Sequence, residues 1–432
     1  MLRILALILT FTLLMDDAKA QAPETAPDQE AAPMTPLEQR AQDVLMILNG
    51  EANGEEVFAP VFLDAVPMAQ VDEIARQFTQ QFGQAIEVLD IEAKGDTAGI
   101  IAVRMERAVG QLNLSVEGGG AHRINGLQLL EFTPTGDTAE TITADLLALD
   151  GTVSAYFGPL DGARPVLALN PEMQMPLGSA MKLYVLGALG EEVAEGKRAW
   201  DDVIALNTKS FPSGQMQDWP MGSPVTLHSF ASLMISISDN TATDQLIRLL
   251  GRQRIEDYMR STGHSEAALN TPWLTTRELF LIKGGSQESV AAYADGSTEQ
   301  RAAIIRTLEH APATKDEINA KLAQGPVAIE TVEWFANTSD LAHLFQTMRA
   351  ASDEEAFRIM AINPALPASP IKKWDYVGFK GGSETGVLNM TWLLTDAQGR
   401  DHLLTLSWAN PKAAVETQTL LLMAQRIASL PQ

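Results

Sequence analysis

Apolar and polar positions follow two different periods in the first third of the chain. Residues 37–48 and 68–82 repeat apolar residues at helical spacing, which predicts two helices. Short alternating runs follow and predict four strands, at residues 85–93, 99–107, 110–117 and 124–132. Helices followed by a run of strands predict a small α+β domain, residues 36–132, with the helices on one face of an antiparallel sheet.

The pattern from about residue 141 onward predicts a second, larger domain, residues 141–432, after a linker-like stretch at residues 133–138. The expected helices cover residues 177–189, 227–236, 241–250, 338–349 and 413–429. The expected strands cover residues 153–157, 165–169, 376–380, 387–395 and 402–408. This order implies an antiparallel sheet assembled from both ends of the domain and flanked by helices. An all-helical lobe lies beside it, with a cleft between the two.

The first twenty residues have the composition of a targeting segment. Arg3 precedes residues 4–14, which are apolar apart from two threonines, and Ala18-Lys19-Ala20 matches a small-x-small cleavage site. This apolar run is too short to cross a bilayer, so we expect a cleaved signal peptide over residues 1–20, with a short membrane anchor as the alternative. Residues 21–35, rich in Ala, Pro, Glu and Gln, are expected to form a disordered linker.

Composition excludes several classes of function. The chain carries 31 basic and 55 acidic side chains, a net charge of −24, so it offers no electrostatic attraction for nucleic acid. It contains no cysteine, which excludes disulfides, thiol chemistry and cysteine-based metal sites. An exported protein without disulfides fits a bacterial periplasm or secreted space, with no stable membrane span after signal cleavage. The six histidines are scattered without a His-Glu-x-x-His motif, so we expect no metal centre and no cofactor.

Ser179 and Lys182 form the first of three motifs that carry chemistry. Ser179 opens the helix expected over residues 177–189, and Lys182 shares its face three residues later. A serine hydroxyl becomes a nucleophile when a base accepts its proton, and a lysine can do so when burial or another cation lowers its pKa. The helix start also offers backbone N–H groups to an oxyanion. Ser-x-x-Lys alone is weak, because roughly one match is expected by chance in a chain of this length. A helix cap and a solvated lysine then explain the pair.

The second motif, Ser238-Asp239-Asn240, lies between two predicted helices. Placed opposite Ser179, Ser238 could relay a proton to a leaving group, and Asn240 could hydrogen-bond an amide of the substrate. Asp239 is better suited to fixing the turn. The same three residue types are also ordinary at helix ends, where they cap the following helix.

The third motif, Lys380-Gly381-Gly382-Ser383, ends a predicted strand and precedes a turn. Glycines let a substrate lie close against the strand backbone, so we expect Gly382 and Ser383 to contact it. Lys380 would add positive charge beside Lys182, whereas an isolated hairpin lysine would only be solvated. The three motifs in this order, each in a suitable setting, are far less probable by accident than any one of them.

Ser-x-x-Lys, Ser-Asp-Asn and a lysine-glycine turn make up the motif set of class A β-lactamases and penicillin-binding proteins. The chain resembles this superfamily from about residue 141 to its end, which implies a β-lactamase-like second domain. The resemblance implies these roles: Ser179 as nucleophile, Lys182 as its base, Ser238 as proton relay, Asn240 as a substrate contact, Lys380 as the electrostatic member, and the N–H groups of Ser179 and Ser383 as the oxyanion hole.

Further stretches are similar to one subgroup of the superfamily. Residues 224–227, 238–244, 274–280 and 380–384 look like proteins in which a steroid-isomerase-like or cystatin-like domain precedes a β-lactamase-like domain. One such protein is encoded in the clavulanic-acid gene cluster. The resemblance implies the same kind of domain for residues 36–132, although these residues show no isomerase site.

Two departures from the family pattern concern recognition of a substrate carboxylate. The family usually has a hydroxyl residue directly after the third-motif lysine, where this chain has Gly381. It often has an arginine in the next strand, and residues 387–395 contain none. Both features argue against tight binding of a β-lactam carboxylate.

Deacylation in class A β-lactamases uses a glutamate in a Glu-x-x-x-Asn pattern to activate water. Glu266 and Asn270 have that spacing, so Glu266 is a candidate deacylating base and Asn270 a candidate lining residue of the cleft. Pro272 and Thr275 follow almost at once and leave little room for the loop that normally carries such a glutamate. A solvated helix end is therefore the alternative for Glu266.

An exported serine hydrolase that acts through an acyl-enzyme is the function that the sequence predicts. Its substrate would be a small-molecule or peptide-like amide or ester, with a β-lactam as the favoured class. The alternatives are a D-Ala-D-Ala peptidase or an esterase on the same scaffold, and a non-catalytic binding protein that keeps the fold. A Ser-His-Asp triad stays open, although the chain has no Gly-x-Ser-x-Gly elbow. A homo-oligomer also stays open.

Core packing is the commoner role of the tryptophans that could line a cleft, Trp200, Trp219, Trp273 and Trp334.

Overall fold

The computed structural model describes residues 34–431, apart from 52–53, 212, 309–319, 321–322 and 367–370. The expected signal peptide and nearly all of the expected linker lie outside the described residues. Thr35, the last residue of that linker, caps the first helix by accepting a hydrogen bond from the Glu38 N–H at 3.2 Å. Within the described ranges, no helix combines the length and the apolar character that crossing a bilayer requires.

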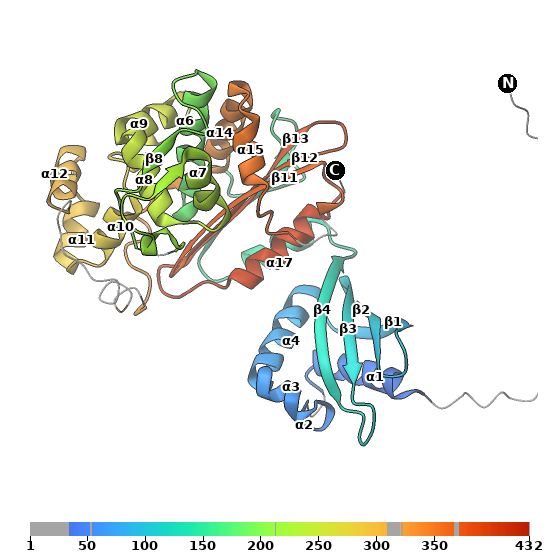
Figure 1. The fold of residues 1–432 in the computed structure, drawn as a ribbon. Coiled ribbons are helices and arrows are strands. Elements are labelled where there is room, and N and C mark those ends of the chain that lie inside the picture. The colour runs from blue at the N-terminus through green and yellow to red at the C-terminus, as the bar shows by residue number, and fades with distance from the viewer. Residues whose placement is uncertain are drawn as a thin grey trace, which may run out of the picture.

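Helices precede a four-stranded antiparallel sheet in the N-terminal part of the chain (Figure 1). The helices are α1 (Pro36–Leu48), α2 (Gly54–Val57), α3 (Pro60–Ala65) and α4 (Met68–Phe82). The strands, paired in chain order, are β1 (Ala85–Ala93), β2 (Ala98–Met105), β3 (Ala108–Val116) and β4 (Ile124–Pro134). The predicted long helices and strands are confirmed, whereas α2 and α3 are too short to show a period. Val44, Phe78 and Phe132 are buried where α1 and α4 meet the sheet.

A five-stranded antiparallel sheet lies at the centre of the second part of the chain. Its order, β11-β12-β13-β5-β6, joins two strands that come early in this part with three that come late. The strands are β5 (Thr152–Pro159), β6 (Leu167–Leu169), β11 (Tyr376–Glu384), β12 (Val387–Thr395) and β13 (Asp401–Ala409). The prediction of an α+β fold, with a sheet assembled from both ends and a helical lobe beside it, is confirmed.

Helices cover both faces of this sheet. One face packs against α5 (Ala139–Leu147) and α17 (Thr417–Ala428), and the other meets the helical lobe. The lobe begins with η1 (Gly178–Met181) and α6 (Lys182–Ala194). Its other helices are η2 (Met216–Asp218), α7 (Leu227–Ser236), α8 (Asn240–Leu250), α9 (Arg252–Ser261), η3 (Ala267–Asn270), α10 (Thr276–Lys283), α11 (Gln287–Ala294), α12 (Thr298–Leu308), α14 (Thr338–Ala351) and α15 (Glu354–Met360). The short strands are β7 (Met175–Pro176), β8 (Val203–Ala205), β9 (Pro224–Thr226) and β10 (Phe335–Ala336).

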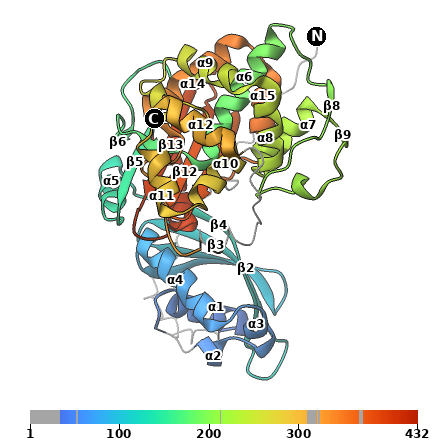
Figure 2. The same cartoon turned by 90° about the vertical axis from the view of Figure 1, so that its left-hand side faces the viewer.

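The C-terminal helix α17 joins the two parts of the chain. Both views show the N-terminal unit beside the larger part, and Figure 1 shows α17 between them (Figure 1, Figure 2). Leu422 is buried in the core of the N-terminal unit, whereas Leu420 belongs to the core beneath the five-stranded sheet. Arg426 is fully buried and pairs with Asp137 at 2.7 Å and Asp145 at 2.8 Å. This ion cluster fixes the point where the connection after β4 meets α17.

Replacing Arg426 by methionine is expected to lower the free energy of unfolding by about 3–5 kcal/mol, because Asp137 would stay buried without its cation. Urea titration followed by circular dichroism measures the loss. Arg358→Met is the matched control, since Arg358 is 66% exposed and pairs at the surface with Glu354 and with the half-buried Glu355. An exposed pair contributes less than about 1 kcal/mol. Equal losses in the two variants would contradict the role given to Arg426.

Candidate active site

Ser179 lies in a 3-10 turn, not in an α-helix. The turn η1 carries Ser179, and α6 begins only at Lys182, so the expected helix over residues 177–189 starts later than predicted. Gly178 accounts for the turn, because its φ of +50° lies in the left-handed region that side chains disfavour. Residues three apart eclipse one another in a 3-10 turn. Ser179 and Lys182 therefore still face the same side.

The 3-10 turn lies directly against strand β11. A Cβ atom at Gly382 would lie 2.0 Å from the Leu177 carbonyl oxygen and 2.4 Å from the Ser179 backbone nitrogen, so only glycine fits there. A Cβ atom at Gly178 would in turn lie 3.1 Å from the Ser383 backbone nitrogen. The backbone nitrogens of Ser179 and Ser383 are thus near neighbours across this contact. Oxyanion holes are commonly built from two neighbouring backbone N–H groups of this kind.

Lys182 is fully buried and gives its N–H bonds to the second motif. Its Nζ donates to Ser238 O at 2.7 Å, to Ser238 Oγ at 3.0 Å and to Asn240 Oδ1 at 2.7 Å. Burial, and then the charge of Lys380, lower the pKa of Lys182 well below its ordinary value. Among the described residues no hydrogen bond joins Lys182 Nζ to Ser179 Oγ, because the ammonium protons have these other acceptors. Only a neutral lysine, with its lone pair, can take the serine proton.

Ser238 connects the two buried lysines of the motifs. Its Oγ lies 3.0 Å from Lys182 Nζ and 3.1 Å from Lys380 Nζ. Lys380 is 3% exposed, and burial lowers its pKa to about 7. Ser238 also has a φ of +59°, which is uncommon for a residue with a side chain and is often found at functional sites. The hydroxyl is therefore held where it can exchange a proton with either lysine.

Asp239 fixes this turn, in agreement with its expected role. Its carboxylate accepts hydrogen bonds from the backbone N–H groups of Gln215, Met216 and Ala242 at 2.7, 2.8 and 2.9 Å. The third of these contacts makes Asp239 the N-cap of α8. Asn240 is the first residue of that helix, which aims its side chain at the buried lysine of the first motif.

A cleft of about 440 Å³ lies over Ser179 and collects the residues of all three motifs. Those that line it are Ser179, Ser238, Asn240, Lys380, Gly381, Gly382 and Ser383. Apolar side chains form much of the remaining wall, namely Ile235, Ile237, Phe280, Phe379, Leu388 and Met390. No arginine is found among the described residues that line the cleft. Among the described lining residues, Lys380, although largely buried, is the single cation that the cleft offers to an anionic substrate.

A second cavity, of about 30 Å³, also reaches Ser179 and is lined by two carboxyl groups that the motifs do not include. They belong to Glu333, which comes just before β10, and to Glu384, the last residue of β11. Glu333 Oε2 accepts a hydrogen bond from the Gly178 N–H at 3.2 Å, so it is held beside the residue that precedes Ser179. A cavity of this volume can hold a water molecule.

Lys283 lies buried between these two carboxyl groups. Its Nζ donates to Glu333 Oε1 at 3.0 Å and also to Glu384 Oε1. Burial acts to lower the pKa of Lys283, but the charges of Glu333 and Glu384 outweigh it and raise that pKa. Burial raises the pKa of Glu384 to about 8. Glu384 is therefore mostly protonated at neutral pH, and Glu333 Oε1 lies 3.0 Å from Lys283 Nζ.

The structure does not bring Glu266 and Asn270 to the cleft, which corrects the expectation for both. Glu266 is exposed, and Asn270 is buried with its amide bound to the backbone of Phe335, at 2.8 and 2.9 Å. Neither residue lines either cavity. Glu333 and Asn337 have the same Glu-x-x-x-Asn spacing. The sequence thus contains a second match to the pattern, and the fold places the glutamate of that match beside the candidate nucleophile.

The tryptophans that could line a cleft belong mainly to the core of the lobe. Trp273 and Trp334 are buried, and Trp200 and Trp219 pack against the same core. Trp334 alone of these four also lines the small cavity. Within the described part of the chain, no group of three or more histidine, aspartate or glutamate side chains is arranged to hold a metal ion.

Known proteins match much of the part of the chain that carries this site, and the family match covers the first two motifs but ends before the third. A model of the family described as the beta-lactamase enzyme family matches residues 137–360, more than half of the chain. The chain is similar to the structure of a beta-lactamase from Sphaerobacter thermophilus, with 22% identity, a TM-score of 0.48, and coverage of 67% of this chain and 94% of that one. It is also similar to a PBP-A variant solved as an acyl-enzyme complex with penicillin G, with 17% identity, a TM-score of 0.46, and coverage of 67% and 93%. No curated protein sequence gives a significant match.

Proposed function

Because the chain belongs to the beta-lactamase enzyme family, we propose that it hydrolyses an amide or ester through an acyl-enzyme on Ser179. The observation that carries this proposal is the bridge from Lys182 through Ser238 to Lys380 in the cleft over that serine. Burying two lysine side chains beside one hydroxyl is unfavourable for stability. A non-catalytic binding protein on the same fold would have no need of this arrangement, whereas proton transfer requires it.

Acylation follows from the groups around Ser179. Its Oγ attacks the carbonyl carbon, and its proton passes to the neutral amine of Lys182. The N–H groups of Ser179 and Ser383 stabilise the oxyanion that forms. When the bond to the leaving group breaks, Ser238 gives its proton to that group and recovers one from Lys182. The Oδ1 atom of Asn240 continues to accept the hydrogen bond from Lys182 Nζ. The Nδ2 group of Asn240 is then free to donate a hydrogen bond to a substrate carbonyl.

Deacylation then uses Glu333, not Glu266. A water molecule in the small cavity attacks the acyl carbonyl and gives its proton to the Glu333 carboxylate, which acts as a general base. Lys283 donates a hydrogen bond to that buried carboxylate and holds it beside the cavity. Collapse of the second tetrahedral intermediate returns a proton to Ser179 Oγ and releases the acid product. The volume of the cavity and the contact of Glu333 with the Gly178 N–H support this assignment.

A β-lactam is the substrate class that family membership favours, and an ester is the second candidate. Two features of the cleft favour an ester with an apolar acyl group. The described lining residues include no arginine to hold a carboxylate, and apolar side chains form much of the wall. A D-Ala-D-Ala peptidase would also have to bind a terminal carboxylate, so it ranks third.

Three arms of one experiment separate these substrate classes. The protein is incubated with benzylpenicillin, with a chromogenic cephalosporin and with p-nitrophenyl butyrate, and intact-protein mass spectrometry detects covalent adducts. A stable adduct without turnover indicates a penicillin-binding role, rapid cephalosporin turnover a β-lactamase, and turnover of the ester alone an esterase. Absence of adducts and of turnover in all three arms would contradict a serine hydrolase.

We also propose that residues 36–132 form a steroid-isomerase-like or cystatin-like domain ahead of a β-lactamase-like domain over residues 141–432. The helices and antiparallel meander of the N-terminal unit support the first part.

The protein would act after export, in a bacterial periplasm or secreted space. The composition of residues 1–20 supports export, and a mature N-terminus at Gln21 in protein expressed with its own leader would test it.

Lys380 is expected to give the cleft a pH-dependent preference for anions. The pKa of Lys380 is about 7, so its side chain is charged below that pH and neutral above it. The ratio of kcat/KM for anionic benzylpenicillin to that for a neutral ester should fall about tenfold between pH 6 and 8.5, because only the cation attracts a carboxylate. Taking a ratio cancels the titration of the shared base. Lys380→Met should make the ratio flat, and a flat ratio in the unaltered protein would contradict the prediction.

A further inference from the structure

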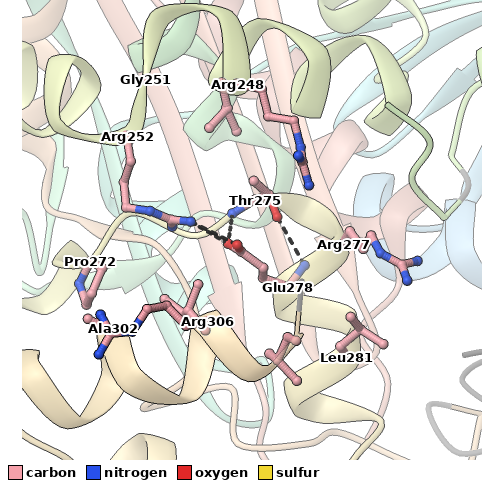
Figure 3. A pocket seen from close by; sticks show the side chains of 13 residues that line it. Arg248, Gly251, Arg252, Pro272, Thr275, Arg277, Glu278, Leu281, Ala302 and Arg306 are labelled. Carbon is pink, nitrogen blue, oxygen red and sulfur yellow. Dashed lines mark hydrogen bonds and ion pairs between the residues drawn. The ribbon is translucent and has the colours of Figure 1, made fainter. Parts of the chain in front are cut away.

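A cavity in the helical lobe carries an excess of positive charge that the proposed reaction does not use. Its volume is about 370 Å³, and it lies where α8, α9, α10 and α12 meet (Figure 3). Four arginines line it, Arg248, Arg252, Arg277 and Arg306, together with one carboxylate, that of Glu278. The chain as a whole has a net charge of −24. Even with Arg277 left out, since it lies over the Phe211 ring, three guanidinium groups share the cavity with one carboxylate in an otherwise acidic protein.

Arg252 has a donor in this cavity that lacks an acceptor. Its Nη2 donates to both Glu278 oxygens, at 2.8 and 3.1 Å. Its Nη1 is buried and has no hydrogen-bond partner among the described residues. Buried polar groups in native proteins nearly always have a partner, so this N–H is available in the cavity to an acceptor that a ligand or a water molecule supplies.

Glu278 cannot neutralise the remaining charge. Besides binding Arg252, its carboxylate accepts the Thr275 backbone N–H at 2.8 Å and closes the capping box at the start of α10. Arg248 and Arg306 form no ion pair with any residue that the structure describes. Figure 3 shows the Arg252–Glu278 pair in the middle of the cavity, with Arg248 above it and Arg306 below.

The start of α9 adds to the positive potential. This helix of ten residues begins at Arg252, and its N-cap is Gly251, which has no side chain to accept from the first N–H groups. The N-terminal end of a helix carries a partial positive charge and favours anions. A guanidinium at that end is unfavourable unless negative charge lies close by, and Glu278 supplies only one such charge.

We propose that this cavity binds a small molecule with a doubly charged anionic group, either a phosphomonoester or a dicarboxylate. Arg252 would hold the anion from within, and Arg248 and Arg306 from the exposed rim. Guanidinium groups pair with phosphate and carboxylate oxygens through two parallel hydrogen bonds, which gives direction as well as charge. The volume is in the range of small-molecule sites and leaves room for an organic remainder beyond the anionic group.

This site is distinct from the catalytic cleft. The residues of α10 that line the small cavity beside Ser179 are Thr276, Leu279 and Phe280. Those that line the arginine cavity are Arg277, Glu278 and Leu281, with the N-cap Thr275. The two sites therefore use different faces of one helix, and failure of either proposal leaves the other standing.

Isothermal titration calorimetry of the full chain at low and constant ionic strength tests the site. Inorganic phosphate and succinate are the two probes, and sodium chloride at matched ionic strength is the blank. We expect saturable binding of at least one probe, weakened at least about tenfold in the double variant Arg248→Gln, Arg306→Gln. Both substitutions change exposed side chains without partners among the described residues, so the fold should persist.

The matched control is the double variant Lys94→Gln, Arg164→Gln, which removes the same charge from exposed positions outside the cavity. It should keep the affinity of the unaltered protein. Tighter binding of phosphate would identify a phosphoryl ligand, and tighter binding of succinate a dicarboxylate. The proposal is overturned if neither probe binds, or if the control variant loses as much affinity as the arginine variant.

Discussion

Replacing Ser179 by alanine is expected to abolish covalent labelling by benzylpenicillin. It should also lower kcat/KM for any turned-over substrate by about 10³-fold or more, because nucleophile and base act as a unit. Ser179 lines both the cleft and the small cavity, so its hydroxyl can be reached by a substrate and, after acylation, by a water molecule. Intact-protein mass spectrometry measures the labelling, and a chromogenic cephalosporin or ester assay measures the rate.

Ser213 offers the matched control for this substitution. It also lines the cleft, and its hydroxyl donates to the Ser238 carbonyl oxygen at 2.6 Å. Ser213→Ala removes the same atom from the same cleft and should leave covalent labelling intact. A Ser179→Ala protein that is still acylated at an unchanged rate would show that another side chain is the nucleophile.

The order of the three motifs led to the expectation that Ser179, Ser238 and Lys380 lie together, and all three line one cleft. Ser179, Ser238 and Lys380 each stand where one element ends and another begins, and the sheet assembled from both ends of the domain brings those junctions together. Such positions follow from periodicity and turn residues, which depend on local sequence. The same reason explains why the four N-terminal strands were predictable, since alternate positions of β3 are buried.

The hydrogen bonds of Lys182 could not be predicted in the same way. They require that the carbonyl and the hydroxyl oxygen of Ser238 both face Nζ, in a residue whose φ is +59°. Nothing in a Ser-Asp-Asn sequence requires a left-handed serine. The sequence also did not predict that α17 contacts two separate hydrophobic cores. The apolar pattern of a helix indicates that one face is buried, but it does not indicate against which core.

The carboxyl cluster shows the limit of spacing as a guide. Glu-x-x-x-Asn occurs at Glu266 and again at Glu333, and only tertiary structure separates the exposed glutamate from the buried one. Lys283 is the last residue of a helix. A lysine at that position is commonly solvated, and its charge interacts favourably with the negative end of the helix dipole. Its burial against Glu333 and Glu384 comes from segments far away in the sequence, so no local pattern indicates it.

Glu333→Gln is expected to trap the acyl-enzyme. Glutamine keeps an oxygen that can accept from the Gly178 N–H, but it cannot take a proton from water. Deacylation should therefore slow by about 10²–10⁴-fold, while acylation stays within a few fold of its original rate. Removing the charge of Glu333, which helps to raise the pKa of Glu384, should also bring that pKa below about 8. Rapid-quench mass spectrometry, following the adduct on Ser179 as it forms and decays, measures both steps.

Two further variants decide which carboxyl group is the base. Glu266→Gln should leave deacylation unchanged, because Glu266 is exposed and lines neither cavity. Glu384→Gln should slow deacylation much less than Glu333→Gln, since Glu384 is mostly protonated at neutral pH and a protonated carboxyl accepts no proton. Accumulation of the adduct in Glu384→Gln but not in Glu333→Gln would transfer the role to Glu384. Unchanged decay in both would mean that the small cavity does not hold the attacking water.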